Sequence, residues 1–528
     1  MWRKRKAVKM TQEAVKTEEI KLTREQDHEE RRAAALAMGG PKKLEARRAE
    51  GRLNARERLA LLLDPGTFRE SGLFTTSAVE ADRHKTPADG KVTGTGEVDG
   101  RRAAVVAYDF TVKGSSSSPV SNKKMSNFKE LVGRVGMPLV YLSESTGVRM
   151  PDAMGGTGMG SANGKTRFLR KRESPWVSAA FGYCFGSAAW HTVAADFAVF
   201  RKGSGLAVSS PGLVSRATGQ QVDAQELGGW KVHAEVTGYA DAVADTDEEA
   251  IELVRRFLSY MPAHNGEAPP LAPVPAGSGE RAAELNQIVP ESRTKTYDVR
   301  KVIDIIADAD SVFPIKARYG KSLVTSLARI GGQSVGIIAN NPMFKGGALD
   351  GAACDKATSF LVLCDSYNIP VIMLVDQPGF LIGLEAEHNK VAGKIINWMN
   401  ALSLVTVPKI SVTMRKNYGQ AFINMGGGGT ADATAGWWST EVSFMDPTSA
   451  VSVVHGLDPQ TDPEMYELRL AEMAKGTTAY DVARVYGFEQ VIDPAETREF
   501  ILGALKDHHR ARSNGVGEHN LSTWPTSF

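Results

Sequence analysis

The order of hydrophobic and polar positions divides the chain into a charged helical start and a longer α/β region. Residues 11–63 are rich in Glu, Lys, Arg, Ala and Leu, and Gly39-Gly40-Pro41 interrupts them. This pattern predicts two charged helices in an exposed arm, the second of which ends near Leu63. Short apolar runs separated by glycines begin near Gly90, and such runs are typical of strands.

Strands and helices alternate beyond that point. Residues 91–101 predict a β-hairpin that turns at Asp99-Gly100, and residues 103–108 predict the next strand. Residues 138–143 predict a buried strand after an intervening helix. This alternation indicates βαβ units with a largely parallel sheet.

Proline and glycine concentrate between residues 264 and 296, a composition typical of a linker. We therefore expect an arm and lead-in over residues 1–84, a first domain over 85–262, a linker over 263–296 and a second domain over 297–528.

The α/β pattern occurs twice. Ala107–Gly114 (AYDFTVKG) matches Ala339–Gly346 (ANNPMFKG) 232 positions later. Pro138–Gly147 (PLVYLSESTG) matches Pro370–Gly379 (PVIMLVDQPG) at the same distance. Matches in one order and nearly in register indicate a duplicated α/β domain. The alternative is a chance recurrence of strand, proline and glycine.

A third match gives the repeat a chemical meaning. A predicted strand runs from Pro175 to a glycine at 186, and another runs from Pro408 to a glycine at 419. A strand that turns sharply at glycine into a helix leaves backbone N–H groups free. Such groups can hold a developing oxyanion, so two corners suggest a reaction with two oxyanions.

The loops beside these corners contain few acid–base side chains. Ser145–Arg149 and Gln377–Phe380 follow the Pro138 and Pro370 strands, and in α/β sheets this edge binds ligands. These loops contain neither a nucleophile elbow nor a P-loop. The chemistry would then depend on backbone donors and orientation, which suits enolate formation from a thioester.

Composition excludes several classes of protein. The net charge is +2, with 42% hydrophobic and 23% charged residues, which gives no case for nucleic-acid or acidic-membrane binding. Three cysteines fit a reducing compartment, and no Cys/His spacing predicts a metal site. No apolar run could span a bilayer, and the basic start lacks an apolar core, so we expect a cytoplasmic protein. Met10 is an alternative start, with residues 1–9 as an upstream addition.

Beyond about residue 45 the chain resembles the carboxyltransferase (β) subunits of biotin-dependent acyl-CoA carboxylases, the propionyl-CoA and methylcrotonyl-CoA carboxylase group. The segments that carry the resemblance are Gly51–Gly66 (GRLNARERLALLLDPG), Asp109–Val112 (DFTV), Ile338–Met343 (IANNPM), Asp376–Leu381 (DQPGFL), Thr406–Ile410 (TVPKI), Arg415–Ala421 (RKNYGQA) and Asp493–Arg498 (DPAETR).

The resemblance implies an α/β fold of two tandem crotonase-like domains (the ClpP/crotonase superhelix) behind an N-terminal helical arm. It implies a hexamer, a trimer of dimers, in which one chain's first domain faces another chain's second domain. It also implies acyl-CoA as substrate, biotin on a partner carrier as cofactor, and no metal. The partners would be a biotin carboxylase and a biotin carboxyl carrier subunit.

The resemblance also assigns the two corners. The first, Gly186 with Ser187, would hold the acyl-CoA enolate. The second, Gly419, Gln420 and Ala421, would hold the ureido oxygen of biotin.

Further positions are expected to bind substrate. Ile423 falls on the position that reads the acyl group in the family. The neighbouring loops would contribute Thr146, Gly147, Arg149, Gly379 and Phe380. Arg149 could approach a phosphate of CoA or form a structural ion pair.

The sequence departs from the family pattern at four of these positions. Thr146 lies in a Ser-Thr-Gly-Val-Arg loop that is usually Ser-Gly-Gly-Ala-Arg. Ser187 and Gln420 each replace a glycine, which is tolerable if φ stays negative, because the donors are backbone amides. Ile423 stands where propionyl-type enzymes carry Asp, so we expect an unusual acyl group.

Other side chains have plainer interpretations. We expect Cys184 to be a buried structural thiol and Trp437-Trp438 to pack the second core. His191, His233, His388 and His455 are scattered and are expected to be structural.

Three other functions stay open. A biotin-linked acyl-CoA decarboxylase or transcarboxylase would run the same half-reaction in another direction. A scaffold subunit would have altered, inactive corners. A crotonase-type hydratase or hydrolase would need a Glu or Asp in the pocket.

Overall fold

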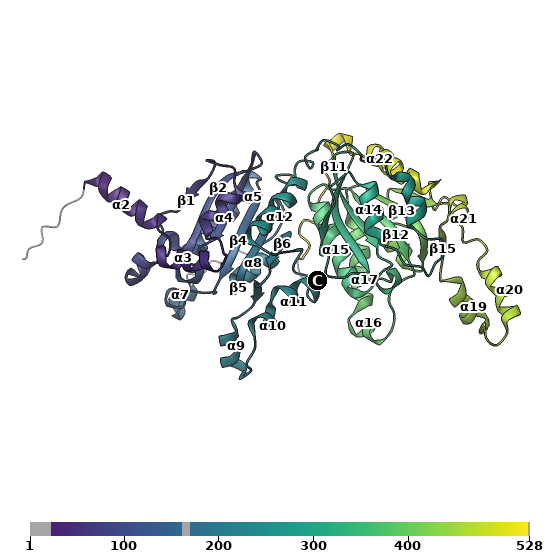
Figure 1. Cartoon of the computed structure of the whole chain (residues 1–528), viewed down its shortest axis with the longest axis horizontal. Helices are drawn as coiled ribbons and strands as arrows, with labels where there is room; N and C mark the ends of the chain where they lie inside the picture. Colours follow the sequence, from purple (N-terminus) through teal and green to yellow (C-terminus); the bar gives the residue numbers. More distant parts are fainter. Residues whose placement is uncertain (1–22, 161–168, 526–528) are drawn as a thin grey trace, which may run out of the picture.

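A computed structural model describes residues 23–160 and 169–525, and its strands form two sheets that lie side by side along the long axis (Figure 1). The first sheet contains β1 (Arg69–Ser71), β2 (Lys91–Val98), β3 (Arg101–Tyr108), β4 (Leu139–Ser145), β5 (Trp176–Phe185), β6 (Phe197–Arg201), β7 (Gly205–Ala207) and β8 (Ala242–Ala244). The second contains β9 (Phe313–Ile315), β10 (Leu323–Ile330), β11 (Gln333–Asn340), β12 (Val371–Gln377), β13 (Lys409–Tyr418), β14 (Ala433–Trp437), β15 (Glu441–Ser443) and β16 (Gln490–Ile492). The alternative start at Met10, with residues 1–9 as an upstream addition, concerns a segment outside the described residues.

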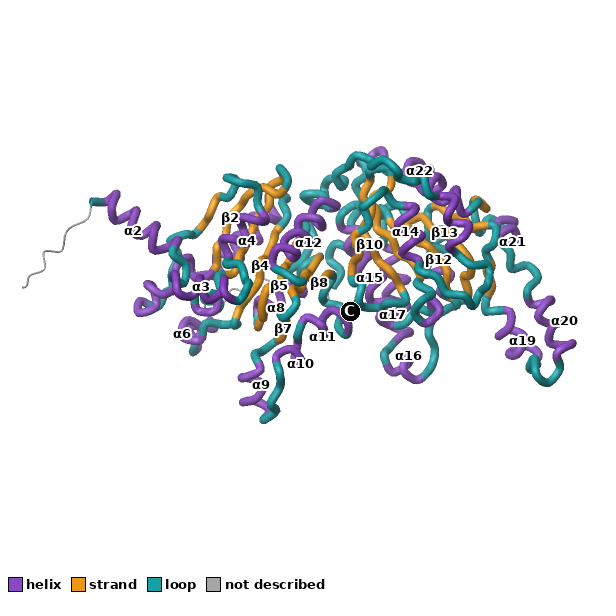
Figure 2. Tube along the Cα trace, viewed as in Figure 1, coloured by secondary structure: helices purple, strands orange, loops and turns teal. Residues whose placement is uncertain are grey.

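The two sheets have the same topology, with strands and helices alternating along the chain (Figure 2). In the first, β2 and β3 are antiparallel, and β3, β4, β5 and β6 are parallel neighbours. In the second, β10 and β11 are antiparallel, and β11, β12, β13 and β14 are parallel neighbours. The short strands β7 and β15 extend the ends of β5 and β13. The prediction of largely parallel sheets is confirmed.

The hairpin of β2 and β3 turns at the predicted residues. Asp99 has φ 50° and Gly100 has φ 73°. Two consecutive positive φ angles define the type I′ turn that Asp-Gly favours, because its twist matches that of the flanking strands.

Helices cover the sheets and extend beyond them. Those of the first part are α2 (Arg24–Leu36), α3 (Pro41–Ala49), α4 (Ala55–Leu62), α5 (Pro119–Val135), α6 (Met150–Ala153), α7 (Gly155–Gly160), α8 (Ser187–Val193), α9 (Pro211–Thr218), α10 (Ala224–Gly228), α11 (Trp230–Glu235) and α12 (Asp247–Tyr260). Those of the second part are α13 (Leu285–Ile288), α14 (Val299–Ile306), α15 (Gly351–Ser366), α16 (Leu384–His388), α17 (Val391–Leu404), α18 (Ala421–Asn424), α19 (Pro447–His455), α20 (Pro463–Met473), α21 (Ala479–Arg484) and α22 (Thr497–Asp507). Short 3₁₀ helices are η1 (Glu80–Lys85), η2 (Pro87–Gly90), η3 (Lys113–Ser115), η4 (Ala282–Glu284), η5 (Lys345–Gly347), η6 (Pro494–Glu496) and η7 (Ala511–Ser513).

The arm contains three described helices, so the prediction of two was wrong. The break at Gly39-Gly40-Pro41 is confirmed, with Gly40 at φ 87° and Pro41 opening α3. A second break follows at Gly51, and the Asn54 side chain then caps α4 by accepting from two backbone amides. Charged residues continue on both sides of Asn54, so the sequence pattern did not show that a new helix starts there. α4 is also not exposed, because Leu59 and Leu62 are buried.

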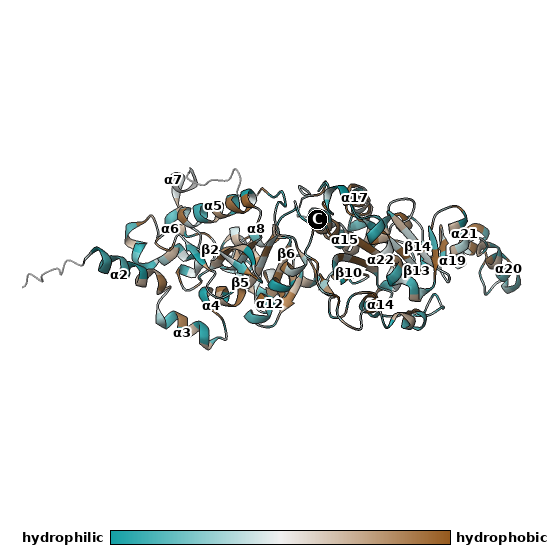
Figure 3. Cartoon of the chain, turned by 90° about the horizontal axis from the view of Figure 1, so that it is seen from above, coloured by the Kyte–Doolittle hydropathy of each residue, from teal (hydrophilic) through white to brown (hydrophobic). Residues whose placement is uncertain are grey.

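The hydrophobic core continues from one half into the other. Phe197 of β6 stacks on Phe257 of α12, with ring centroids 4.4 Å apart. The ring of Phe197 also lies 5.5 Å from that of Phe313 in β9. Figure 3 shows hydrophobic residues in the strands, whereas the outlying helices α2 and α20 are mostly hydrophilic. The linker between the halves carries η4 and α13, and the domain boundaries at its ends remain a prediction.

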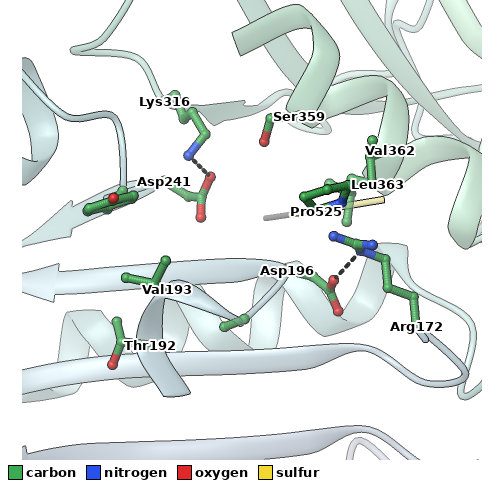
Figure 4. A pocket seen from close by; sticks show the side chains of 12 residues that line it. Arg172, Thr192, Val193, Asp196, Asp241, Lys316, Ser359, Val362, Leu363 and Pro525 are labelled. Carbon is green, nitrogen blue, oxygen red and sulfur yellow. Dashed lines mark ion pairs between the residues drawn. The ribbon is translucent and has the colours of Figure 1, made fainter. Parts of the chain in front are cut away.

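Buried ion pairs line a small cavity of about 50 Å³ where the halves meet (Figure 4). Lys316 Nζ lies 3.1 Å from Asp241 Oδ1, and Arg172 Nε lies 3.3 Å from Asp196 Oδ1. The cavity reaches Val193 at the end of α8, the opposite end from Gly186. It therefore belongs to the contact between the halves and not to the predicted corners.

The end of the described chain closes this contact. Arg172 Nη1 donates to the carbonyls of Ser522 and Trp524 at 3.0 and 2.8 Å. Leu521 is fully buried, and its amide donates to Asp365 Oδ2. The C-terminal segment thus ties the first half to the second.

Candidate functional site

Both predicted corners are present, at the carboxyl edge of each sheet. Gly186 follows β5 with φ 61°, and Gly419 follows β13 with φ 67°. Helix α8 begins at Ser187, and α18 begins at Ala421. A positive φ reverses the chain at low cost only in glycine, which explains the residue type at both turns.

The neighbouring loops repeat the same backbone bond. Ser117 N donates to Gly147 O at 2.8 Å, and Leu349 N donates to Gly379 O at 3.1 Å. Each donor and each acceptor lies 232 positions from its counterpart. The two halves therefore hold their glycine loops by the same backbone bond.

In the first corner the amides of Gly186 and Ser187 have no acceptor among the described residues. Ser187 is the first residue of α8, so its side chain causes no backbone strain. Gly147 Cα lies 3.9 Å from the point that a Cβ on Gly186 would occupy. The Ser117 and Ser187 hydroxyl oxygens lie 3.4 Å apart. Gly147, Gly186 and Ser187 are thus brought together, as predicted.

The second corner corrects one assignment. The Gly419 amide donates to Ser443 O at 3.1 Å, so it is already engaged and cannot serve a ligand. The amides of Gln420 and Ala421 have no acceptor within the described chain. Gln420 has φ −60°, so its side chain is accommodated without strain. Gly419 supplies the turn, and the candidate donors are Gln420 and Ala421.

Arg149 is held inside the protein. Its guanidinium pairs with Asp89 and lies 3.5 Å from Asp152 Oδ2, and its side chain is 4% exposed. Its Nη2 also donates to Ser116 O at 3.1 Å. The structure therefore favours the structural ion pair over a contact with CoA. Thr146, by contrast, is exposed beside Gly147.

The remaining predicted binding residues surround the second corner. The ring of Phe380 contacts that of Trp398 edge-on at 6.4 Å. Gln420 Nε2 lies 3.6 Å from Met399 Sδ, one residue further along the same helix. Ile423 lies in α18 and is partly exposed. α17 thus forms one wall of this corner.

Two buried carboxylates beside the loops were missed at the sequence level. Glu144 Oε2 lies 2.6 Å from Arg47 and 3.2 Å from Arg58. Its counterpart Asp376, 232 positions later, has its two oxygens 2.8 and 2.9 Å from Arg415 and Lys416. In the sequence, the two carboxylates are separated by the same offset as the other repeated segments, and this recurrence could have identified them.

Both carboxylates are enclosed by cationic side chains. Burial opposes ionisation of Glu144, but Arg58 and Arg47 outweigh it and lower its pKa. The Asp376 side chain is fully buried between its two cations. Neither carboxylate is free to act as a general base.

Other singled-out side chains are structural. Cys184 is fully buried, and burial raises the pKa of its thiol well above the ordinary value. His233 Nε2 lies 2.9 Å from Leu206 O. Trp437 is buried and donates to Thr497 Oγ1, whereas Trp438 is 48% exposed, so only Trp437 packs the second core.

Neither a metal centre nor a membrane span is found in the described part of the chain. Residues 23–160 and 169–525 contain no group of three His, Cys, Asp or Glu side chains arranged for a metal ion. In the same residues, every helix is too short or too polar to cross a bilayer.

Comparison with known proteins identifies relatives across the whole fold. Residues 46–516 match the family model of the carboxyl transferase domain. The propionyl-CoA carboxylase carboxyltransferase subunit of Haloferax mediterranei is 35% identical over 495 residues, which cover 90% of this chain and 94% of the relative. Methylmalonyl-CoA decarboxylase subunit alpha of Veillonella parvula is 32% identical over 484 residues, covering 90% and 94%.

A solved structure has the same fold. The crystal structure of transcarboxylase 12S, described as a hexamer with methylmalonyl-CoA and methylmalonic acid bound, matches with a TM-score of 0.84 and 34% identity. The match covers 93% of this chain and 97% of that one. The predicted tandem α/β fold is therefore confirmed, and the chain belongs to the carboxyl transferase domain family.

Proposed function

We propose that the chain is the carboxyltransferase component of a biotin-dependent acyl-CoA carboxylase. It would move a carboxyl group from carboxybiotin to the α-carbon of an acyl-CoA. The observation that carries this proposal is the pair of repeat-related corners, each with two unengaged amides.

The two pairs of amides would have separate tasks. Those of Gly186 and Ser187 would stabilise the charge on the thioester oxygen as the α-carbon loses its proton. One such donor is typically worth about 3–4 kcal/mol of transition-state stabilisation. Those of Gln420 and Ala421 fit the ureido oxygen of biotin, which is a hydrogen-bond acceptor.

Proton transfer would not need a protein base. Carboxybiotin, when bound, supplies CO₂ and a ureido group that can accept the α proton. The two carboxylates at the ends of the strands that lead into the loops, Glu144 and Asp376, are paired with cations. This arrangement argues against a hydratase or hydrolase, which would use a free carboxylate.

Ile423 would contact the acyl group. Its Cγ1 lies 3.5 Å from the point that a Cβ on Gly428 would occupy, so its side chain packs on the glycine tract that follows α18. We infer an acyl chain that differs from propionyl, since the family resemblance gives propionyl-type enzymes an Asp here.

The functional unit would contain further copies of the chain. Helices α9 and α19–α20 extend away from the sheets (Figure 1), and α9 and α19 each begin at a proline, Pro211 and Pro447. Val208 and Phe444, close to these helices, are 78% and 83% exposed. We propose that such surfaces pair two copies so that the first corner of one faces the second corner of the other, within a hexamer.

The chain would work with a biotin carboxylase and a biotin carboxyl carrier subunit. We place this complex in the cytoplasm, because the three cysteines are free and buried, as is usual in a reducing compartment.

A decarboxylase or transcarboxylase is the second candidate. The relative from Veillonella parvula is named as a decarboxylase subunit, and the same corners would serve either direction. A scaffold with inactive corners is less well supported, because Ser187 and Gln420 leave the backbone of both corners unstrained.

The test is the half-reaction of the purified chain. A panel of carboxylated acyl-CoAs is incubated with free biotin or a biotinylated carrier, and decarboxylated acyl-CoA is measured by mass spectrometry. We expect biotin-dependent turnover of one acyl class, and a shift toward propionyl-type substrates in Ile423→Asp. Biotin-independent hydrolysis, or no turnover of any acyl-CoA, would contradict the proposal.

A further inference from the structure

Lys91 is a lysine in the interior of the first half that no described carboxylate neutralises. It opens β2, and its side chain is fully buried. Its Nζ lies 3.8 Å from the centre of the Tyr108 ring, and no carboxylate of the described residues lies within ion-pair distance. Burial lowers its pKa well below the ordinary value. Burying an ammonium group without a carboxylate partner destabilises the folded protein, so we expect Lys91 to serve a purpose other than stability.

The ammonium group holds one residue of the loop after β3. Lys91 Nζ donates to the Ser115 hydroxyl at 2.7 Å and also to the Ser115 carbonyl. The Ser115 hydroxyl in turn donates to Gly90 O at 2.8 Å. Ser115 has φ 49°, a left-handed conformation that disfavours residues with a side chain.

The contacts continue from Ser115 to the first corner. Ser145 Oγ donates to Ser115 O at 3.0 Å and accepts from the Gly147 amide at 3.2 Å. Gly147 is the residue that lies against Gly186. Hydrogen bonds through Ser115, Ser145 and Gly147 thus connect Lys91 to the first corner.

The second half lacks this arrangement. The counterpart of Lys91, 232 positions later, is Leu323, and that of Ser115 is Gly347 with φ 86°. The repeat therefore forms the same turn with glycine and an apolar neighbour. The first half accepts a buried cation and a strained serine instead.

We propose that Lys91 and Ser115 are positioning residues for the first corner. They fix the Ser145–Gly147 loop against Gly186, so that the thioester oxygen meets correctly placed amides. This role rests on the proposed function, and it belongs only to the acyl-CoA side.

The test separates stability from catalysis. Lys91→Met and Ser115→Gly should keep or raise the thermal midpoint, because one removes a buried cation and the other relieves a positive φ. Both should lower kcat for acyl-CoA turnover by about 10- to 100-fold, since small misplacement of reacting groups has effects of that size. KM should change little. The control is Asp310→Gly, which relieves a similar φ of 58° at an exposed site and should leave kcat unchanged.

A second measurement does not depend on turnover. Hydrogen exchange of the segment 144–148 should be faster in both variants and unchanged in Asp310→Gly. An unchanged kcat in an active protein, or a loss of kcat only in proportion to a lower thermal midpoint, would overturn the inference. If the parent protein turns over no acyl-CoA, the proposed function fails, and exchange at 144–148 alone decides the positioning role.

Discussion

At the scale of single residues, the two corners use the amide of a residue and not its side chain. Ser187 and Gln420 stand where the family resemblance leads one to expect glycine, yet both adopt helical backbone angles. The glycines that the turns require are Gly186 and Gly419, whose φ is positive. The identity of the following residue is therefore free to vary without loss of the donor.

Replacement of Ser187 tests this directly. Ser187→Pro removes one N–H at the first position of α8, where the fixed φ of proline fits a helix. We expect kcat for carboxyl transfer to fall by about 100- to 1000-fold, the usual effect of losing one oxyanion donor. Ser187→Ala retains the amide and should stay within a few fold of the parent. Equal rates for the two variants would show that this amide has no catalytic role.

Two buried lysines form another repeated pair at this scale. Lys124 Nζ donates to Lys91 O, and Lys356 Nζ donates to Leu323 O, both at 2.7 Å. Burial lowers their pKa to about 8 and about 7, respectively. Each lysine secures the start of the antiparallel hairpin in its own half.

The pKa of Lys356 predicts a pH dependence of stability. Between its folded pKa of about 7 and the unfolded value of about 10.4, the unfolded chain binds more protons, so the free energy of unfolding rises with pH. The thermal midpoint of the parent should therefore increase relative to Lys356→Met across this window. Lys345→Met, at an exposed ion pair, is the control: it retains Lys356, so its thermal midpoint should change with pH in parallel with that of the parent. Parallel curves for the parent and Lys356→Met would contradict the assigned pKa.

At the scale of elements, ion pairs join the arm helices to the first sheet. Arg47 of α3 and Arg58 of α4 both reach Glu144 at the end of β4. Arg58 Nη2 also lies 2.8 Å from Asp247 Oδ2 at the start of α12. One buried carboxylate thus holds two helices against the strand that leads into the first loop.

Removal of that carboxylate should be strongly destabilising. Glu144→Gln leaves the buried Arg47 without a carboxylate partner and Arg58 with Asp247 alone, and breaking such a buried pair typically costs about 3–5 kcal/mol of unfolding free energy. Arg31→Ala breaks an exposed pair with Asp27 and should leave the free energy of unfolding almost unchanged. Urea denaturation measures both. Similar values for the two variants would mean that the buried cluster contributes no more than a surface pair.

Much of the element order followed from the sequence. The hairpin at Asp99-Gly100 and the duplicated strands were predictable because turn residues and apolar runs are local signals. The Asn54 cap was hidden inside a continuous charged pattern. The ion pairs of Arg149 and Glu144, and the bond that engages the Gly419 amide, join segments far apart in the chain, which no local pattern reveals.

At the scale of the whole molecule, the two corners lie in different sheets, and we propose that each works with the opposite corner of a second copy. Mixing two inactive variants tests this. Ser187→Pro disables a first corner, and Gln420→Pro removes a donor from a second corner at a residue whose φ of −60° suits proline.

Co-expression of the two variants should restore activity. If copies pair at random head to tail, about a quarter of the composite sites would contain two intact corners. The restored kcat per site, measured against the parent, should approach that fraction. Activity no higher than that of either variant alone would place both corners of one site in the same chain.

The C-terminal segment that contains Leu521 and Trp524 has a consequence for biosynthesis. Both sheets leave the ribosome before this segment does, since translation proceeds from the N-terminus. The two carbonyls that accept from Arg172 are therefore made only after both sheets. The hydrogen bonds between this segment and the first half can thus form only after both sheets have been synthesised, so the contact between the halves, begun by the shared core, is completed late in folding.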